Sequence, residues 1–135
     1  SKAFLALYLL SGLMGNLFVL VFSPEAVAAG ASTALFGIFG AIVSLRFIAR
    51  SPYIRYLGQR YTSLILINLL FSFMPGISLA GHLGGLVGGG LLAFVFPVYG
   101  EQDSVKKSWR WGAVVLYTAG AILLYAWPLF AHPFL

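Results

Sequence analysis

The chain has 135 residues, of which 61% are hydrophobic and only 8% are charged, and its mean hydropathy is +0.97. Since a soluble domain carries about 25% charged residues, this composition excludes an ordinary water-soluble fold and predicts an integral membrane protein. The net charge of +5 does not indicate nucleic-acid binding, because the basic residues lie in short segments between apolar runs. The lack of cysteine excludes disulfides and thiol chemistry within the chain.

The hydropathy pattern predicts an all-α, polytopic helix bundle, one membrane domain over residues 1–135, with about five spans near the roughly 20 residues that cross a bilayer. The first two are expected at about 3–22 and 28–45, and the third, at about 61–73, is short. The fourth and fifth follow at about 79–98 and 109–130. The first run has the length of a full span and no small-residue cleavage site, so a cleaved signal peptide is not expected.

The basic residues predict the orientation. With five spans, all eight lie on one side of the membrane, and the positive-inside rule makes that side cytoplasmic: Lys2, Arg46, Arg50, Arg55, Arg60, Lys106, Lys107 and Arg110. Three tryptophans near the ends of the fifth span fit an aromatic belt: Trp109, Trp111 and Trp127. We therefore expect a multi-pass protein of a bacterial cell membrane, with spans two and four beginning at the outer face.

Ser32 and His82 lie near the starts of spans two and four, so the topology brings them to similar depths below the outer surface. A serine hydroxyl becomes an effective nucleophile when a base takes its proton, and histidine is the usual base. Small-residue runs are common in membrane helices without a catalytic role, whereas an intramembrane histidine is by default a functional candidate. No carboxylate is available to orient the imidazole. A Ser32–His82 dyad is therefore the leading hypothesis, with Ser32 near a helix N-terminus that favours a developing negative charge.

Glycines predict how the two helices approach. Gly81, Gly85 and Gly89 are spaced four apart and leave one face of span four almost without side chains, and span two offers small residues in return: Ala34, Gly37, Gly40 and Ala41. Phe36 lies one turn after Ser32 and is expected to pack on the His82 imidazole.

Two further polar residues and one connecting segment have interpretations outside the proposed pair. Asn16 is interpreted as a helix-packing residue rather than a catalytic one, and His132 as a solvated residue of the tail. Residues 74–78 form either a lid over the site or a short turn.

Two motifs resemble the rhomboid family of intramembrane serine proteases. They are Gly30-Ala31-Ser32 followed by Ala34-Leu35-Phe36-Gly37, and Ala80-Gly81-His82-Leu83-Gly84-Gly85 with Gly89. The resemblance covers about residues 3–98 and implies that these are core helices three to six, with 109–130 an additional C-terminal helix. It implies that Ser32 is the nucleophile and His82 the general base. Gly30, Thr33, Phe36, Gly81, Gly85 and Gly89 would support the oxyanion site and the helix packing.

The chain departs from the family pattern in two ways. Thr33 stands where the motif usually has glycine, and two interpretations are open: its side chain crowds the oxyanion pocket, or it is a tolerated variant. The first two core helices, the second of which bears a His-x-x-x-Asn pair, have no counterpart, since Gly12 lies four positions before Asn16. The chain thus resembles the C-terminal portion of a longer protein, and alone we expect it to be weakly active or inactive, because losing one oxyanion donor costs about 10²–10³ in rate.

The predicted function is that of a serine endopeptidase that cleaves transmembrane or juxtamembrane segments of membrane proteins near the outer face, without cofactor or metal. Its expected partners are transmembrane protein substrates and the lipid bilayer, and not nucleic acid. Two alternatives remain: a non-catalytic rhomboid-like protein that binds transmembrane segments, and part of a small-solute transporter. The transporter would be favoured by an internal repeat, and no clear repeat is present.

Overall fold

The computed structural model describes residues 1–26, 31–98 and 100–133, and in these ranges every regular element is an α-helix. The helices are α1 (Lys2–Phe22), α2 (Ala31–Ile48), α3 (Pro52–Phe71), α4 (Leu79–Val95) and α5 (Lys107–Ala131). Helices α1, α2 and α5 are long and apolar enough to cross a membrane, and α4 is a shorter apolar helix of 17 residues. The predicted all-α bundle of five helices is therefore confirmed.

The boundaries agree with the predicted spans within a few residues, except at α3. The start predicted for the second span falls within residues 27–30, outside the described residues. Helix α3 begins at Pro52, nine residues before the predicted span, so Arg55 and Arg60, which the predicted bounds leave outside any span, lie within a helix. The reason is capping: the Ser51 side chain accepts from the Ile54 N–H and Pro52 occupies the first turn. Hydropathy identifies what a bilayer covers, whereas these local signals set where the helix starts.

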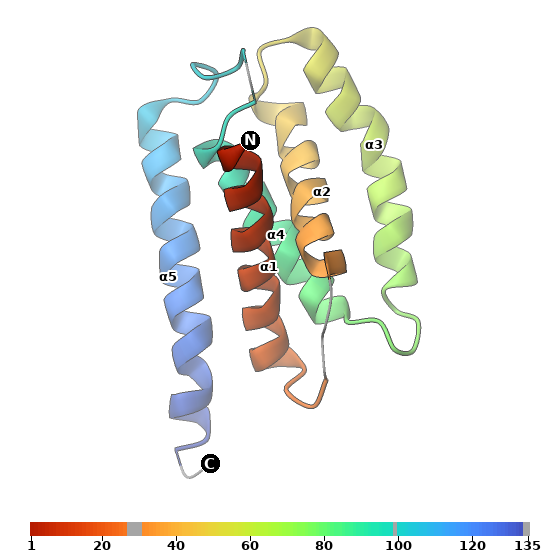
Figure 1. Ribbon diagram of the computed structural model, residues 1–135, viewed down its shortest axis with the longest axis vertical. Coiled ribbons are helices and arrows are strands. Elements are labelled where there is room, and N and C mark those ends of the chain that lie inside the picture. Colours follow the sequence, from red (N-terminus) through yellow and green to blue (C-terminus); the bar gives the residue numbers. More distant parts are fainter. Residues whose placement is uncertain (27–30, 99, 134–135) are drawn as a thin grey trace.

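Helix α4 is the centre of the bundle and packs on α1, α2 and α5. Figure 1 shows α1, α2 and α4 together, with α5 on one side and α3, which packs on α2, on the other. The N-terminus, the α2–α3 junction and the segment leading into α5 lie at one end of the bundle (Figure 1). The α3–α4 connection lies at the opposite end, where α4 begins.

Glycines let α4 sit this deeply. A Cβ atom at Gly85 would collide with the carbonyl oxygen of Thr33, and one at Gly89 with that of Gly37, so backbone meets backbone between α4 and α2. On another face of α4, Gly84 and Gly88 lie against α1. The predicted close approach of the two glycine-rich helices is therefore present.

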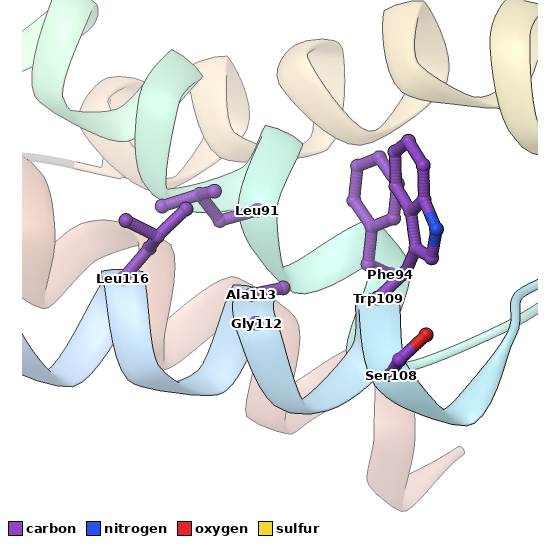
Figure 2. Close-up of a pocket in the computed structure, with 7 residues that line it drawn as sticks. All are labelled: Leu91, Phe94, Ser108, Trp109, Gly112, Ala113 and Leu116. Carbon is purple, nitrogen blue, oxygen red and sulfur yellow. The ribbon is translucent and has the colours of Figure 1, made fainter.

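Helix α5 is attached more loosely. An open cavity of about 440 Å³ lies between part of it and α4, with Leu91 and Phe94 on the α4 side (Figure 2). The α5 side is lined by Ser108, Trp109, Gly112, Ala113 and Leu116. The Tyr117 hydroxyl donates to the Leu10 carbonyl oxygen on α1 at 2.6 Å. The three tryptophans of α5 are all about 60% exposed, as residues that face lipid headgroups would be.

Candidate active site

Ser32 and His82 meet at the end of the bundle where α4 begins. The Ser32 Oγ lies 3.1 Å from His82 Nε2, within hydrogen-bonding distance. Ser32 is the second residue of α2 and is exposed, whereas His82 is only 7% exposed. Ser78 caps α4 by accepting from the Gly81 N–H and so fixes the helical turn that carries His82. The hydroxyl is thus accessible while the imidazole beside it is enclosed.

Phe36 covers one face of the imidazole. The two rings are stacked with centroids 4.0 Å apart and an interplanar angle of 12°. Phe39 packs edge-on against Phe36 at 5.3 Å and supports it from behind. The spacing of one helical turn between Ser32 and Phe36 places both on the α2 face that meets His82, as the sequence predicts.

A third side chain, Ser72, contacts the other ring nitrogen. Its Oγ lies 2.5 Å from His82 Nδ1, and the residue is 2% exposed. Sequence reasoning missed it, since Ser72 was only the next-to-last residue of the third predicted span and no motif singled it out. The signal in retrospect is its position directly before the 74–78 connection, which returns the chain to the start of α4.

A cavity of about 270 Å³ opens beside this cluster. It has four polar side chains in an otherwise apolar wall, an arrangement typical of small recognition sites. The polar residues are Ser32, Asn68, Ser72 and His82, and the apolar ones are Leu35, Phe36, Phe39, Phe71 and Ile77.

The residues at 74–78 form a tight turn at the mouth of this cavity. The Ile77 N–H donates to the Met74 carbonyl, with Pro75 and Gly76 between them, and Gly76 has φ +83°. This is the sequence pattern of a type II turn. Ile77 lines the cavity, so the segment is a short turn that also forms part of the wall.

The position of Thr33 favours the second of the two interpretations, that of a tolerated variant. Thr33 is 5% exposed, with its methyl group directed at Gly15 and its hydroxyl near the point where a Gly81 Cβ would lie. Because successive helical residues are rotated by about 100°, Thr33 packs into the junction with α1 and α4 while Ser32 faces the cavity. The threonine is a packing residue here.

The other expected site residues are distributed as follows. Gly81, Gly85 and Gly89 lie along the interface with α2, and Gly30 lies outside the described residues. Asn16 is exposed and makes no side-chain hydrogen bond within the described part of the chain, so its role in helix packing stays a prediction. His132 is exposed at the end of α5, far along the chain from the cluster. No group of three metal-ligating side chains occurs within residues 1–26, 31–98 and 100–133.

Comparison with models of known families matches residues 1–98 to the rhomboid domain. Among curated proteins, the chain is 41% identical over 90 residues to the rhomboid protease GluP of Bacillus subtilis (strain 168), covering 66% of this chain and 18% of that protein. It is 37% identical over 99 residues to RHOMBOID-like protein 1 of Arabidopsis thaliana, covering 70% of this chain and 25% of that protein.

A third relative is matched over more of the chain. Identity to Rhomboid-like protease 3 of Toxoplasma gondii is 32% over 126 residues, which is 90% of this chain and 46% of that protein. No solved structure gives a significant match. The chain thus spans less than half the length of these three relatives. The domain match covers α1 to α4, and with the sequence identities it shows that the chain belongs to the rhomboid family.

Proposed function

We propose that the protein containing this chain is an intramembrane serine endopeptidase, with Ser32 as nucleophile and His82 as general base. The observation that carries the proposal is the 3.1 Å approach of Ser32 Oγ to His82 Nε2, with the imidazole enclosed by Phe36 and Ser72. Nucleophile and base within hydrogen-bonding distance, with the base held by further groups, is the arrangement that activates a serine.

The reaction follows from these positions. Ser32 Oγ forms a bond to the peptide carbonyl carbon while its proton passes to His82 Nε2. The C–N bond then breaks, and His82 returns the proton to the departing amine. Water attacks the resulting ester, its proton passes to His82, and the proton returns to Ser32 Oγ as the acid product leaves. The Ser32 backbone N–H, at the start of α2, would help to hold the oxyanion, favoured by the helix dipole.

The lining of the cavity supports one class of substrate. We propose transmembrane segments of membrane proteins, whose apolar side chains suit the mainly apolar wall beside Ser32. The end of the bundle opposite His82 carries Lys2, Arg50 and Lys106, and by the positive-inside rule this supports a site that faces the outer side of the membrane. This orientation can be tested in bacterial cells with a cysteine introduced in place of Gln102. We expect that cysteine to react only with a maleimide that crosses the membrane. Reaction with a maleimide that cannot cross the membrane would contradict the proposed orientation.

The test is labelling of the full-length protein by a fluorophosphonate probe in detergent micelles. Ser32→Ala and His82→Ala should each lower the labelling rate by about 10³-fold or more, because the two groups act as a unit. Ser63→Ala and His132→Ala are matched controls with exposed side chains, and they should be labelled like the unaltered protein. Undiminished labelling of the Ser32→Ala variant would contradict the assignment of Ser32 as the nucleophile.

The non-catalytic alternative has one observation in its favour, since the same apolar wall would bind a transmembrane segment without cleaving it. It predicts that an apolar transmembrane peptide binds the Ser32→Ala variant and the unaltered protein equally and is cleaved by neither. Cleavage by the unaltered protein alone decides for the protease. Comparing this chain with the full-length protein in the same assay shows how far the segments outside the chain contribute.

A further inference from the structure

We propose that Ser72 is a positioning residue that fixes the tautomer and the orientation of His82, so that Ser32 on α2, His82 on α4 and Ser72, directly after α3, form one directed series of hydrogen bonds. This inference rests on the proposed function of Ser32 and His82. It assigns to a hydroxyl the place that a carboxylate occupies in the serine–histidine–aspartate arrangement.

The contact between Ser72 and His82 is buried and joins the end of one helix to the start of the next. Ser72 directly follows α3, whereas His82 lies in the first turn of α4. The Oγ–Nδ1 distance of 2.5 Å is at the short end for a hydrogen bond, and the hydroxyl is enclosed. Because a buried polar group without a partner is costly, each of these two side chains satisfies the other.

The direction of the hydrogen bond follows from the single proton of a hydroxyl. Ser72 Oγ donates that proton to the Asn68 carbonyl oxygen at 3.3 Å. Asn68 is one of the last four residues of α3. The carbonyl oxygens of these residues receive no hydrogen bond from an N–H group within the helix, so they can accept from another donor. The Asn68 carbonyl can only accept, whereas His82 Nδ1 can donate or accept, so both hydrogen bonds form together only when Ser72 donates to Asn68 and accepts from Nδ1. Nδ1 therefore carries the imidazole proton.

This assignment has a consequence at the other nitrogen. In a neutral imidazole only one nitrogen is protonated, so a protonated Nδ1 leaves the Nε2 lone pair directed at Ser32 Oγ, 3.1 Å away. That is the form able to take the serine proton. The opposite tautomer would present an N–H to Ser32 and could not act as the base.

Phe36 cannot determine which ring nitrogen of His82 faces Ser32. Its stacking restrains the plane of the imidazole, but a 180° rotation about the Cβ–Cγ bond returns the ring to the same plane with nitrogen and carbon positions exchanged, and the stack is kept. A hydroxyl placed at Nδ1 distinguishes the two ring orientations. A neutral hydroxyl also avoids the cost of placing a carboxylate in apolar surroundings.

The chain supplies a close control. Ser11 and Ser72 are the two serines that are almost fully buried, and each donates to the carbonyl four residues earlier. Ser11 lies on α1 and bonds to Leu7, whereas Ser72 also reaches an imidazole. Replacing either with alanine removes one buried hydroxyl and one such hydrogen bond, so a difference between the two variants isolates the contact with His82.

The experiment uses the full-length protein in detergent micelles and two readouts. The first is the rate of Ser32 labelling by a fluorophosphonate, in which the Oγ–P bond forms, the P–F bond breaks, and the proton leaves through His82 with fluoride. The second is the ¹⁵N spectrum of labelled imidazole, with the His82 signals identified by their loss in His82→Asn. Thermal unfolding of each variant shows that it is folded.

Ser72→Ala should label about tenfold more slowly and should lose the predominance of the Nδ1–H signal. Ser72→Thr, which keeps a hydroxyl, should restore both, and Ser11→Ala should change neither. An unaltered tautomer in Ser72→Ala, or an equal loss of labelling in Ser11→Ala, overturns the inference. The proposed function has its own test, and it fails if Ser32→Ala is still labelled. The tautomer readout does not depend on catalysis, so failure of the proposed function and failure of this inference can be distinguished.

Discussion

Helix α4 meets its neighbours α2 and α5 in opposite ways. Toward α2, Gly85 and Gly89 bring backbone against backbone, whereas toward α5 a cavity of about 440 Å³ intervenes and a stacked Phe94–Trp109 pair, 6.3 Å between centroids, lies at its edge (Figure 2). The interface with α2 holds Ser32 and His82 at hydrogen-bonding distance, and α5 contributes no residue to that cluster. The matched rhomboid domain ends at residue 98, before α5 begins.

The comparison shows where the chain needs a fixed distance. Backbone-to-backbone packing has no side-chain rotamers that can adjust, so the spacing between α2 and α4 is set within narrow limits. Side-chain packing around a cavity tolerates change, because volume is available for new atoms. The first kind of interface suits the proposed pair of Ser32 and His82, and the second suits a helix that mainly faces lipid.

The largest expected effect is at Gly89. In Gly89→Ala the added methyl group meets the Gly37 carbonyl oxygen, so α2 and α4 must separate. We expect the free energy of unfolding in detergent to fall by about 3 kcal/mol, and Ser32 labelling to fall with it as the hydroxyl moves from His82.

The matched control for this change is Gly112→Ala on α5, where an added Cβ has no neighbour within 4 Å among the described residues. Its stability should be unchanged or raised, by at most about 1 kcal/mol, because alanine favours helix more than glycine does. Equal losses in the two variants would contradict the contrast between the interfaces.

A smaller effect is expected where α5 is tied to α1. Tyr117→Phe removes the hydrogen bond to the Leu10 carbonyl and should lower the free energy of unfolding by about 1 kcal/mol, with Ser32 labelling unchanged. Tyr125→Phe is the control, since Tyr125 is 65% exposed on the same helix. A large loss of labelling in Tyr117→Phe would show that α5 does support the site.

The smallest effect concerns the loop that leads from α4 to α5. The Glu101 carboxylate accepts from the backbone N–H groups of Arg50 and Ser51, at 2.7 and 2.8 Å, and these bonds hold its pKa below the ordinary value of 4.5. Its contribution to stability is therefore complete above pH 4.5 and is lost as the pH falls through the lowered pKa. In Glu101→Gln, the melting temperature should fall by about 2 °C at pH 7.

The pH dependence sharpens this prediction. Melting temperatures of the unaltered protein should decline below pH 4.5 more steeply than those of Glu101→Gln, which has no carboxylate there to protonate. Asp103→Asn is the control, because Asp103 is exposed in the same loop. Parallel curves for the unaltered protein and Glu101→Gln would mean that the anchored loop contributes nothing to stability.

Several features could be predicted from local sequence. Apolar runs predicted five helices, and glycines four apart predicted a close approach of α4 to α2, because helical periodicity decides which side chains share a face. The same periodicity placed Phe36 on the face of Ser32. The start of α3 was predicted wrongly because hydropathy outweighed the Ser51–Pro52 capping signal.

By itself, the sequence determined the helices, their small-residue faces and the residues able to act as nucleophile and base. Only the tertiary structure decided which groups surround the imidazole: Ser72 reaches His82 because the turn after α3 folds back to the start of α4. It also decided that Thr33 points away from the cavity and that Asn16 is exposed. The reason is that helical spacing fixes neighbours within one helix, whereas contacts between helices depend on their relative position and rotation, which no local pattern encodes.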